Sequence, residues 1–543
     1  MSGVAARALP HEAAAAGPGP QPWADLDATR YLSAAAHVDP RFARTVVREL
    51  LVAEHRLPVP AAGIDLVTVV RHCIAARSRR LYRDAALVVL PLVAAAVSGW
   101  ATVAWYVWLA GLRLLLRAGG IGTGSDSPAI GGGAGGASGA GTGSAAASAA
   151  AASPAIASSA GARAVARFAA LLWSFLALVL FTLAATHADP YGLRSAWGIS
   201  TPSAARVAMW IGVPAAAALC CWLAVFADEV AAFVTVAERL RRDRYTPSRW
   251  LSAEPAWAQH ALAVLGERLA DPRLGHHPLA DPANPFVGAG RQVLRRRWLI
   301  ELGPAASASA PFDNADLLDR ICERLADGLG TLDPADALRG RGGVRIDECA
   351  ISTAPALATR LEQGQVRLIP DARAASHRDA GPRSYRRVRI GGDPSGLTVT
   401  AHLGATAGAG LLQVELYGHV LTPIAARYRV ADHTPPFGWV AAFRCAVRAT
   451  ARLPHAVFSA PRGVLRTAAD PALRRRSRAM LAQAAAAGLT VAAGARFDAR
   501  EAAAAPAGAD RFADEDANLY LSVIERRVRE ELRPLLPAGS NEF

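Results

Sequence analysis

Three long apolar stretches in the first half of the chain constrain its fold more than any other sequence feature. They run over Ala85–Leu116, Ala164–Thr186 and Val207–Ala227. Each is long enough to cross a bilayer, because a helical span needs about 20 predominantly apolar residues. We therefore expect an integral membrane protein with a multi-pass α-helical region, and we assign it to the cell membrane.

Clusters of arginine flank the apolar stretches and indicate their topology. One cluster, Arg77–Arg83, precedes the first stretch, and another, Arg239–Arg244, follows the third. Two further pairs border the segment between the first and second stretches, at 113–117 and 163–167. Arginine is enriched in cytoplasmic loops, so all four clusters are expected on the cytoplasmic side. That assignment requires an even number of crossings.

The first stretch is the one that can supply the extra crossing. It is longer than one span needs, and Ser98-Gly99 lies near its middle, so we expect residues 84–117 to turn back there as a hairpin or re-entrant loop. The alternative is one long span that ends in an aromatic belt at Trp105–Trp108. In the hairpin arrangement only His187–Arg206 is exported, and the bulk of the chain is cytoplasmic.

The remaining composition shifts divide the chain into further segments. The N-terminus lacks the apolar core of a signal peptide, and Asp27, Asp39 and Asp65 are good N-caps for short helices that follow it. A Gly, Ala and Ser segment between the first two stretches is typical of a flexible linker. The predicted segments are a disordered 1–22, a small helical region 23–83, a membrane hairpin or single span 84–117, a linker 118–163, transmembrane spans 164–187 and 207–228, a juxtamembrane helix 229–244 and a cytoplasmic α+β domain 245–543.

The basic residues exclude several enzyme classes. All 59 of them are arginine, since the sequence contains no lysine. P-loop NTPases, ordinary protein kinases and lysine-dependent pyridoxal phosphate enzymes all need a lysine and are excluded. We attribute the net charge of +14 to the juxtamembrane arginines, which interact favourably with anionic lipid headgroups. Membrane lipid is therefore the expected partner. A protein partner is compatible with the sequence, and nucleic acid is disfavoured.

Cysteine and histidine give no metal pattern. The six cysteines include no CxxC pair, which favours free thiols in a reducing compartment. His72-Cys73 and His276-His277 lack further ligands at recognisable spacing. We therefore expect no metal site and no cofactor.

The second half of the chain has the pattern of an α+β domain with an antiparallel sheet. Alternating apolar and polar residues predict strands, and apolar residues at three- to four-residue spacing predict helices. The predicted strands are Val293–Leu302, Tyr385–Ile390, Leu397–Leu403 and Leu411–Val420, and the predicted helices are 313–330, Pro471–Ala486 and 514–533.

The most distinctive loop of this half is Asn284–Arg291, with the sequence NPFVGAGR. Backbone N–H groups at Gly288 and Gly290, with Asn284 and Arg291, are candidates for cradling an anion. No third glycine follows at the dinucleotide-binding spacing, and a strand follows the loop where a helix would be needed, so a structural turn is the favoured interpretation. No GxSxG or HExxH motif is present, and we assign no catalytic residue.

Several segments together resemble a group of uncharacterised multi-pass membrane proteins of high-GC actinobacteria. The resemblance covers both halves of the chain and omits the linker. It implies membrane location and an α+β tail, with no activity to carry over. The matching segments are Arg30-Tyr31-Leu32, Asp39, Val46–Leu51, Gly63–Arg71, the NPFVGAGR loop, Glu415-Leu416-Tyr417, Leu421-Thr422-Pro423-Ile424 and Leu519–Leu532.

Two functions are consistent with these observations. The favoured one is a non-enzymatic anchor or scaffold that presents the cytoplasmic α+β domain to a protein or lipid partner. The alternative is a membrane-associated enzyme with an anion site at the NPFVGAGR loop. The oligomeric state stays open.

Overall fold

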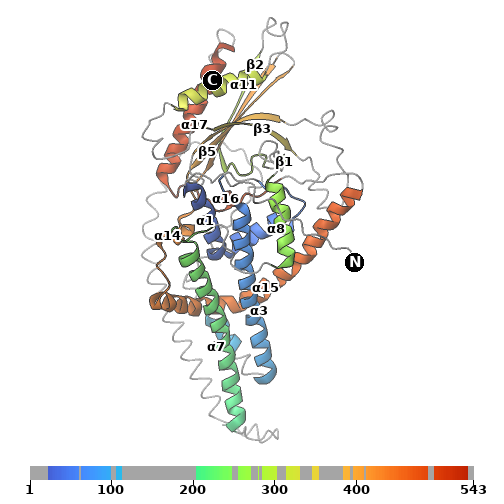
Figure 1. The fold of residues 1–543 in the computed structure, drawn as a ribbon, viewed down its shortest axis with the longest axis vertical. Coiled ribbons are helices and arrows are strands. Elements are labelled where there is room, and N and C mark those ends of the chain that lie inside the picture. The colour runs from blue at the N-terminus through green and yellow to red at the C-terminus, as the bar shows by residue number, and fades with distance from the viewer. Residues whose placement is uncertain are drawn as a thin grey trace, which may run out of the picture.

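A computed structural model describes thirteen segments of the chain (Figure 1). The described segments are 23–59, 63–98, 105–112, 204–246, 255–270, 279–280, 284–301, 314–330, 345–353, 383–391, 395–408, 411–486 and 495–535. The predicted disordered N-terminus, the predicted linker and the second apolar stretch lie outside them.

A small helical module forms the first part of the fold. Its helices are α1 (Trp23–Val38), α2 (Pro40–Val47), the π-helical turn η1 (Arg48–Val52) and the start of α3 (Leu66–Ser98), with α8 (Ala256–Leu269) packed against them. Asp39 caps α2 by accepting hydrogen bonds from the N–H groups of Arg41 and Phe42. Asp65 likewise accepts from the N–H of Thr68 at the start of α3. Both N-caps were predicted from the sequence, whereas the predicted cap Asp27 lies inside α1, which begins at Trp23.

Segments from the C-terminal half complete the core of this module. Ile424, Tyr428 and Ala503 are buried in the same hydrophobic cluster as Leu32 and Val69. Polar contacts reinforce the closure, with the Tyr428 hydroxyl donating to Asp39 at 2.8 Å and Arg30 of α1 donating to Asp432 of α14 (Val430–His433). The elements contributed here are η4 (Ala426–Tyr428), α14 and α16 (Ala499–Ala502).

Two long helices extend away from the helical module. The first is α3, which is continuous for 33 residues although it contains Pro91. The second is α7 (Ala204–Val234), which continues through the π-helical turn η2 (Thr235–Arg239). Leu66–Ser98 and Gly212–Arg239 are long and apolar enough to cross a membrane by length and composition. Figure 1 shows both helices projecting from the same side of the module.

The structure bears on the first apolar stretch only in part. The described part of α3 reaches Ser98, the position at which the sequence predicted a turn. Residues 105–112 are helical again, and Leu109 belongs to the same hydrophobic cluster as Leu87 of α3 and Cys221 of α7. Residues 99–104, which join the two helices, lie outside the described residues.

A six-stranded sheet with the strand order β1-β3-β4-β5-β6-β2 forms the second part of the fold. All its pairings are antiparallel except that of β1 with β3, so the predicted antiparallel sheet is confirmed. Helices α11 and α17 cover one face, where Ile321 and Ile524 are buried against Leu403 and Leu416. The elements are β1 (Leu279–Ala280), β2 (Arg291–Glu301), β3 (Arg345–Thr353), β4 (Arg383–Ile390), β5 (Thr398–Gly408), β6 (Leu411–Leu421), α11 (Asn314–Gly330), α17 (Arg511–Leu532) and the short η5 (Arg533–Leu535).

The longest of the described helices is α15 (Trp439–Ala486). It runs through Pro454, Pro461 and Pro471. The sequence predicted only its last part, Pro471–Ala486, as a helix. Ala449 and Val457 of α15 are buried with Leu87 and Val225, so α15 packs against both α3 and α7.

Candidate functional site

The NPFVGAGR loop makes a tight turn that requires its two glycines. Gly288 and Gly290 have φ of +87° and +91°, in the region that favours glycine. A Cβ atom at Gly290 would lie 2.4 Å from the Val420 carbonyl oxygen, because the loop passes directly over the end of β6. The two glycines therefore fix the path of the chain into β2.

The loop binds a carboxylate, and the carboxylate belongs to this chain. The Gly288 N–H donates to Oε2 of Glu501 at 3.0 Å. Glu501 is held there by α16, whose N-cap Asp498 accepts from the N–H groups of Arg500 and Glu501. Asn284 and Arg291 are exposed at the two ends of the loop.

Phe286 of the same loop covers the second face of the sheet, opposite α11 and α17. Its ring lies 4.3 Å from the His402 ring and 4.9 Å from the His419 ring, measured between centroids. Tyr385 and Tyr417 surround it at 5.6 and 5.1 Å. The sequence analysis singled out the glycines of this loop and missed Phe286. The burial of Phe286 depends on strands that are distant in the sequence, so no local pattern indicates it.

Glu415 of β6 is the centre of a polar network beside Phe286. Its side chain is buried, and it accepts hydrogen bonds from the hydroxyls of Tyr417 at 3.2 Å and Tyr385 at 3.4 Å. Arg297 of β2 forms an ion pair with it at 3.0 Å, and Arg383 of β4 approaches to 3.8 Å. The strand register explains this convergence, since Arg297 lies directly opposite Glu415.

Burial governs the protonation of the groups around this face. It lowers the pKa of His402 well below its ordinary value, with further lowering from nearby His419, and it lowers the pKa of His419 to about 4. Both Nδ1 atoms are buried without a hydrogen-bond partner. Burial also raises the pKa of Asp498 to about 6. Among the described residues no group of three or more His, Cys, Asp or Glu side chains is arranged to hold a metal ion.

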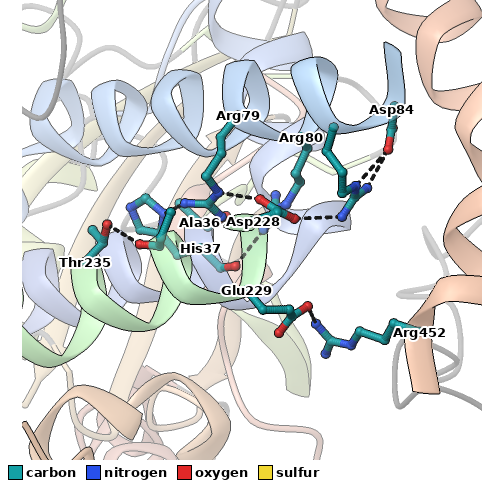
Figure 2. A network of polar contacts seen from close by, with 11 residues as sticks. Ala36, His37, Arg79, Arg80, Asp84, Asp228, Glu229, Thr235 and Arg452 are labelled. Carbon is teal, nitrogen blue, oxygen red and sulfur yellow. Dashed lines mark hydrogen bonds and ion pairs between the residues drawn. The ribbon is translucent and has the colours of Figure 1, made fainter. Parts of the chain in front are cut away.

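A second polar network lies between α3 and α7 (Figure 2). Asp228 of α7 accepts hydrogen bonds from Arg79 and, at 2.7 Å, from Arg83 of α3. Arg83 also pairs with Asp84 at 2.6 Å. Glu229, the next residue of α7, forms an ion pair with Arg452 of α15. We call these six residues the charged layer.

The charged layer is attached to the helical module on one side. Arg80 donates to the carbonyl oxygens of Ala36 and His37 at 3.0 and 2.6 Å. His37 in turn lies 3.1 Å from His72 of α3, nitrogen to nitrogen. On the other side of the layer, α3 exposes large apolar side chains, which are Val89, Leu92, Val93 and Val97.

The C-terminal half matches a known family. Residues 289–538 match the AbeC-like domain. This family is uncharacterised, and the match supports the predicted resemblance to an uncharacterised family in that respect alone. No curated protein and no solved structure shows significant similarity to the chain.

The AbeC-like region includes strands β2 to β6 of the sheet and the helices α11 and α17, whereas β1 precedes it. It begins at Ala289 inside the NPFVGAGR loop and includes Gly290, Arg291, Glu415 and Asp498. Phe286, Gly288, α3 and α7 precede it. The Phe286 contacts therefore join the AbeC-like region to the part of the chain that comes before it.

Proposed function

We propose that the chain is an integral membrane protein that acts as a non-enzymatic anchor or scaffold, presenting its α+β domain at the cytoplasmic face to a protein or lipid partner. The observation that carries the proposal is the continuity of α3. Val69 and Val70 are buried in the core of the helical module, whereas Leu92, on the same helix, is 64% exposed. A single helix thus links a folded core to an apolar surface suited to lipid.

The charged layer supports this interpretation. Charged side chains at the end of a span are favoured where they pair with one another or reach the headgroups. Beyond Asp228, the rest of α7 back to Val207 contains no charged residue. The layer therefore marks the level at which the two helices would enter the hydrocarbon.

The arginine flanks support a cytoplasmic orientation and a multi-pass arrangement. Arg79 and Arg83 belong to the charged layer itself, and Arg239 of η2 lies on the module side of it. By the positive-inside rule this side faces the cytoplasm. The stretch at 164–187 then supplies a further span, and the first stretch returns near Ser98.

The internal hydrogen bond between Gly288 and Glu501 favours an anchor over the enzyme alternative. The Gly288 N–H that was the best anion-binding candidate is bound to Glu501, so an external anion would have to displace a carboxylate of the chain. If Arg291→Ala abolishes binding of a phosphate-bearing ligand by the full chain, that result would favour the enzyme alternative over the anchor.

Three measurements test the proposed anchor. Extraction of native membranes with alkaline carbonate should leave the full chain in the pellet, and release into the supernatant would contradict a membrane-spanning protein. Reporter fusions after residues 130, 195 and 543 should report cytoplasm, exterior and cytoplasm. An external reporter at 543 would overturn the orientation. Affinity purification from detergent-solubilised membranes should recover a stable partner, and the absence of both a partner and lipid binding would contradict the scaffold.

A further inference from the structure

The first three turns of α15 expose an apolar stripe. Trp439 is 83% exposed, Phe443 65% and Val447 53%, and the spacing of four residues aligns them on one face of the helix. The opposite face carries the small residues Ala441, Cys445 and Ala449, all buried. Large apolar side chains thus face outward while small ones pack inward, the reverse of a helix that faces water on one side.

The position of this stripe relative to α3 and α7 indicates which surroundings its side chains contact. Figure 1 shows the start of α15 running across the direction of the two projecting helices, at the level where they leave the module. Arg452 holds α15 to Glu229 of the charged layer, and Trp222 of α7 donates its indole N–H to Thr450 at 3.0 Å. The stripe is therefore fixed at the level of the charged layer.

The residues beside the stripe suit a lipid surface. Arg444 and Arg448 follow Phe443 and Val447 by one residue, so both lie on the same flank of the stripe. An interfacial helix places aromatic and aliphatic side chains at the boundary of the acyl chains and arginine at the phosphates. Tryptophan is enriched at this depth of a membrane.

We propose that the segment 439–450 is an interfacial helix whose stripe of Trp439, Phe443 and Val447 enters the cytoplasmic leaflet. This inference rests on the proposed membrane anchor and deepens it. It means that the chain holds the bilayer both by crossing it and by a helix lying along its surface. The segment 422–438, which contains η4 and α14, connects strand β6 of the sheet to that surface helix.

Photo-crosslinking of the full chain in vesicles of phosphatidylethanolamine and phosphatidylglycerol tests the inference. Benzoylphenylalanine replaces one residue at a time: Phe443 in the stripe, Leu219 on the exposed side of α7, or Phe512 on α17, an exposed phenylalanine outside the proposed membrane region. We expect lipid adducts at 443 and 219 and none at 512. Trp439, the most exposed residue of the stripe, is a second position if the 443 variant does not accumulate.

The outcomes separate the two proposals. A lipid adduct at 219 without one at 443 or 439 overturns the interfacial helix and leaves the anchor intact. The absence of lipid adducts at all these positions overturns both. An adduct at 443 between two copies of the chain, or with another protein, overturns the assignment of lipid as the partner of the stripe.

Discussion

Asp228 of α7 and Arg83 of α3 form an ion pair at 2.7 Å, although 145 residues separate them in the chain. The Asp228 side chain is only 7% exposed, and Arg79 donates to its second oxygen. This pair holds the two projecting helices in register at the level of the charged layer (Figure 2).

Replacing Asp228 by asparagine should destabilise the protein strongly. Arg79 and Arg83 would keep their charges in a mostly buried position without the Asp228 carboxylate, although Arg83 would still pair with Asp84. Breaking a buried pair from one side costs about 3–5 kcal/mol. Thermal unfolding in detergent micelles measures the effect as a lower Tm. The matched control is Glu515→Gln, which breaks the exposed Arg511–Glu515 pair and should change stability by less than about 1 kcal/mol. Equal losses in the two variants would contradict a structural role for the charged layer.

Gly290→Ala should disrupt the entry into β2. The new Cβ would combine a positive φ with an approach of 2.4 Å to the Val420 carbonyl oxygen, so we expect a loss of roughly 2–5 kcal/mol. Gly508→Ala is the control, because Gly508 also has a positive φ but has open space around its Cβ position, and it should cost about 1–2 kcal/mol. Urea denaturation followed by circular dichroism compares the two. A Gly290→Ala loss no larger than the control would show that the loop is not held against β6.

Phe286→Ala should remove the cover of the second sheet face. The ring contacts two histidines and two tyrosines and is buried, and truncating a buried phenylalanine costs about 3–5 kcal/mol. Phe512→Ala serves as the control, because Phe512 is 77% exposed and its truncation should change stability by no more than about 0.5 kcal/mol. Chemical denaturation of both variants distinguishes a packed Phe286 from a surface residue, for which the two losses would be alike.

The stability of the fold should depend on pH through the two buried histidines and through Asp498, whose effects have opposite signs. His402 and His419 have lowered pKa values in the folded protein, so their contribution is complete above their ordinary value of 6.5 and is lost as the pH falls through about 4 for His419. Asp498 has a raised pKa, so its contribution is complete below its ordinary value of 3.8 and is lost as the pH rises through about 6. The two effects cancel in part between pH 4 and 6.

Asp498→Asn removes one of these effects and keeps the side-chain oxygen that caps α16. Urea midpoints of this variant should fall more steeply between pH 6.5 and 4.5 than those of the unmodified protein. The variant should also be at least as stable at pH 7.5, where the unmodified protein buries a charged carboxylate. Parallel pH profiles for the two proteins would contradict the burial argument.

The regular elements of the sheet domain were predictable because their patterns are local. Leu521, Ile524, Val528 and Leu532 repeat at helical spacing, and all four are buried in α17. The strands β4, β5 and β6 each begin within two residues of the predicted positions, since alternation and turn residues mark their ends.

Most of the long helix α15, from Trp439 to Asp470, was missed because local and tertiary signals disagree there. Pro454 and Pro461 lack an N–H and disfavour a helix interior, so the local sequence gives no clear helix signal there. In the structure Ala456, Val457 and Ala460 are buried against α3 and α7, and this packing maintains the helix. The resulting exposed stripe could not be recognised without the helix.

The candidate sites show the same division. The tight turn at Gly288 and Gly290 follows from residue type, whereas Glu501 as the partner of Gly288 requires two segments 213 residues apart to meet. The pairing of Asp228 with Arg79 also depends on such a meeting, because the sequence showed Asp228 only as the charged exit of an apolar stretch.

The way the helical module is completed has a consequence for biosynthesis. Its core contains Leu32 and Val69 from the first helices, and also Ile424 and Ala503 from the other end of the chain. At about 5–20 residues per second, translation needs roughly half a minute to a minute and a half between Leu32 and Ala503. The apolar halves of α3 and α7 therefore emerge, and by our proposal enter the bilayer, while their partners for folding are still unmade. If the proposed spans are correct, insertion comes first, and the folded module closes on helices already held by lipid.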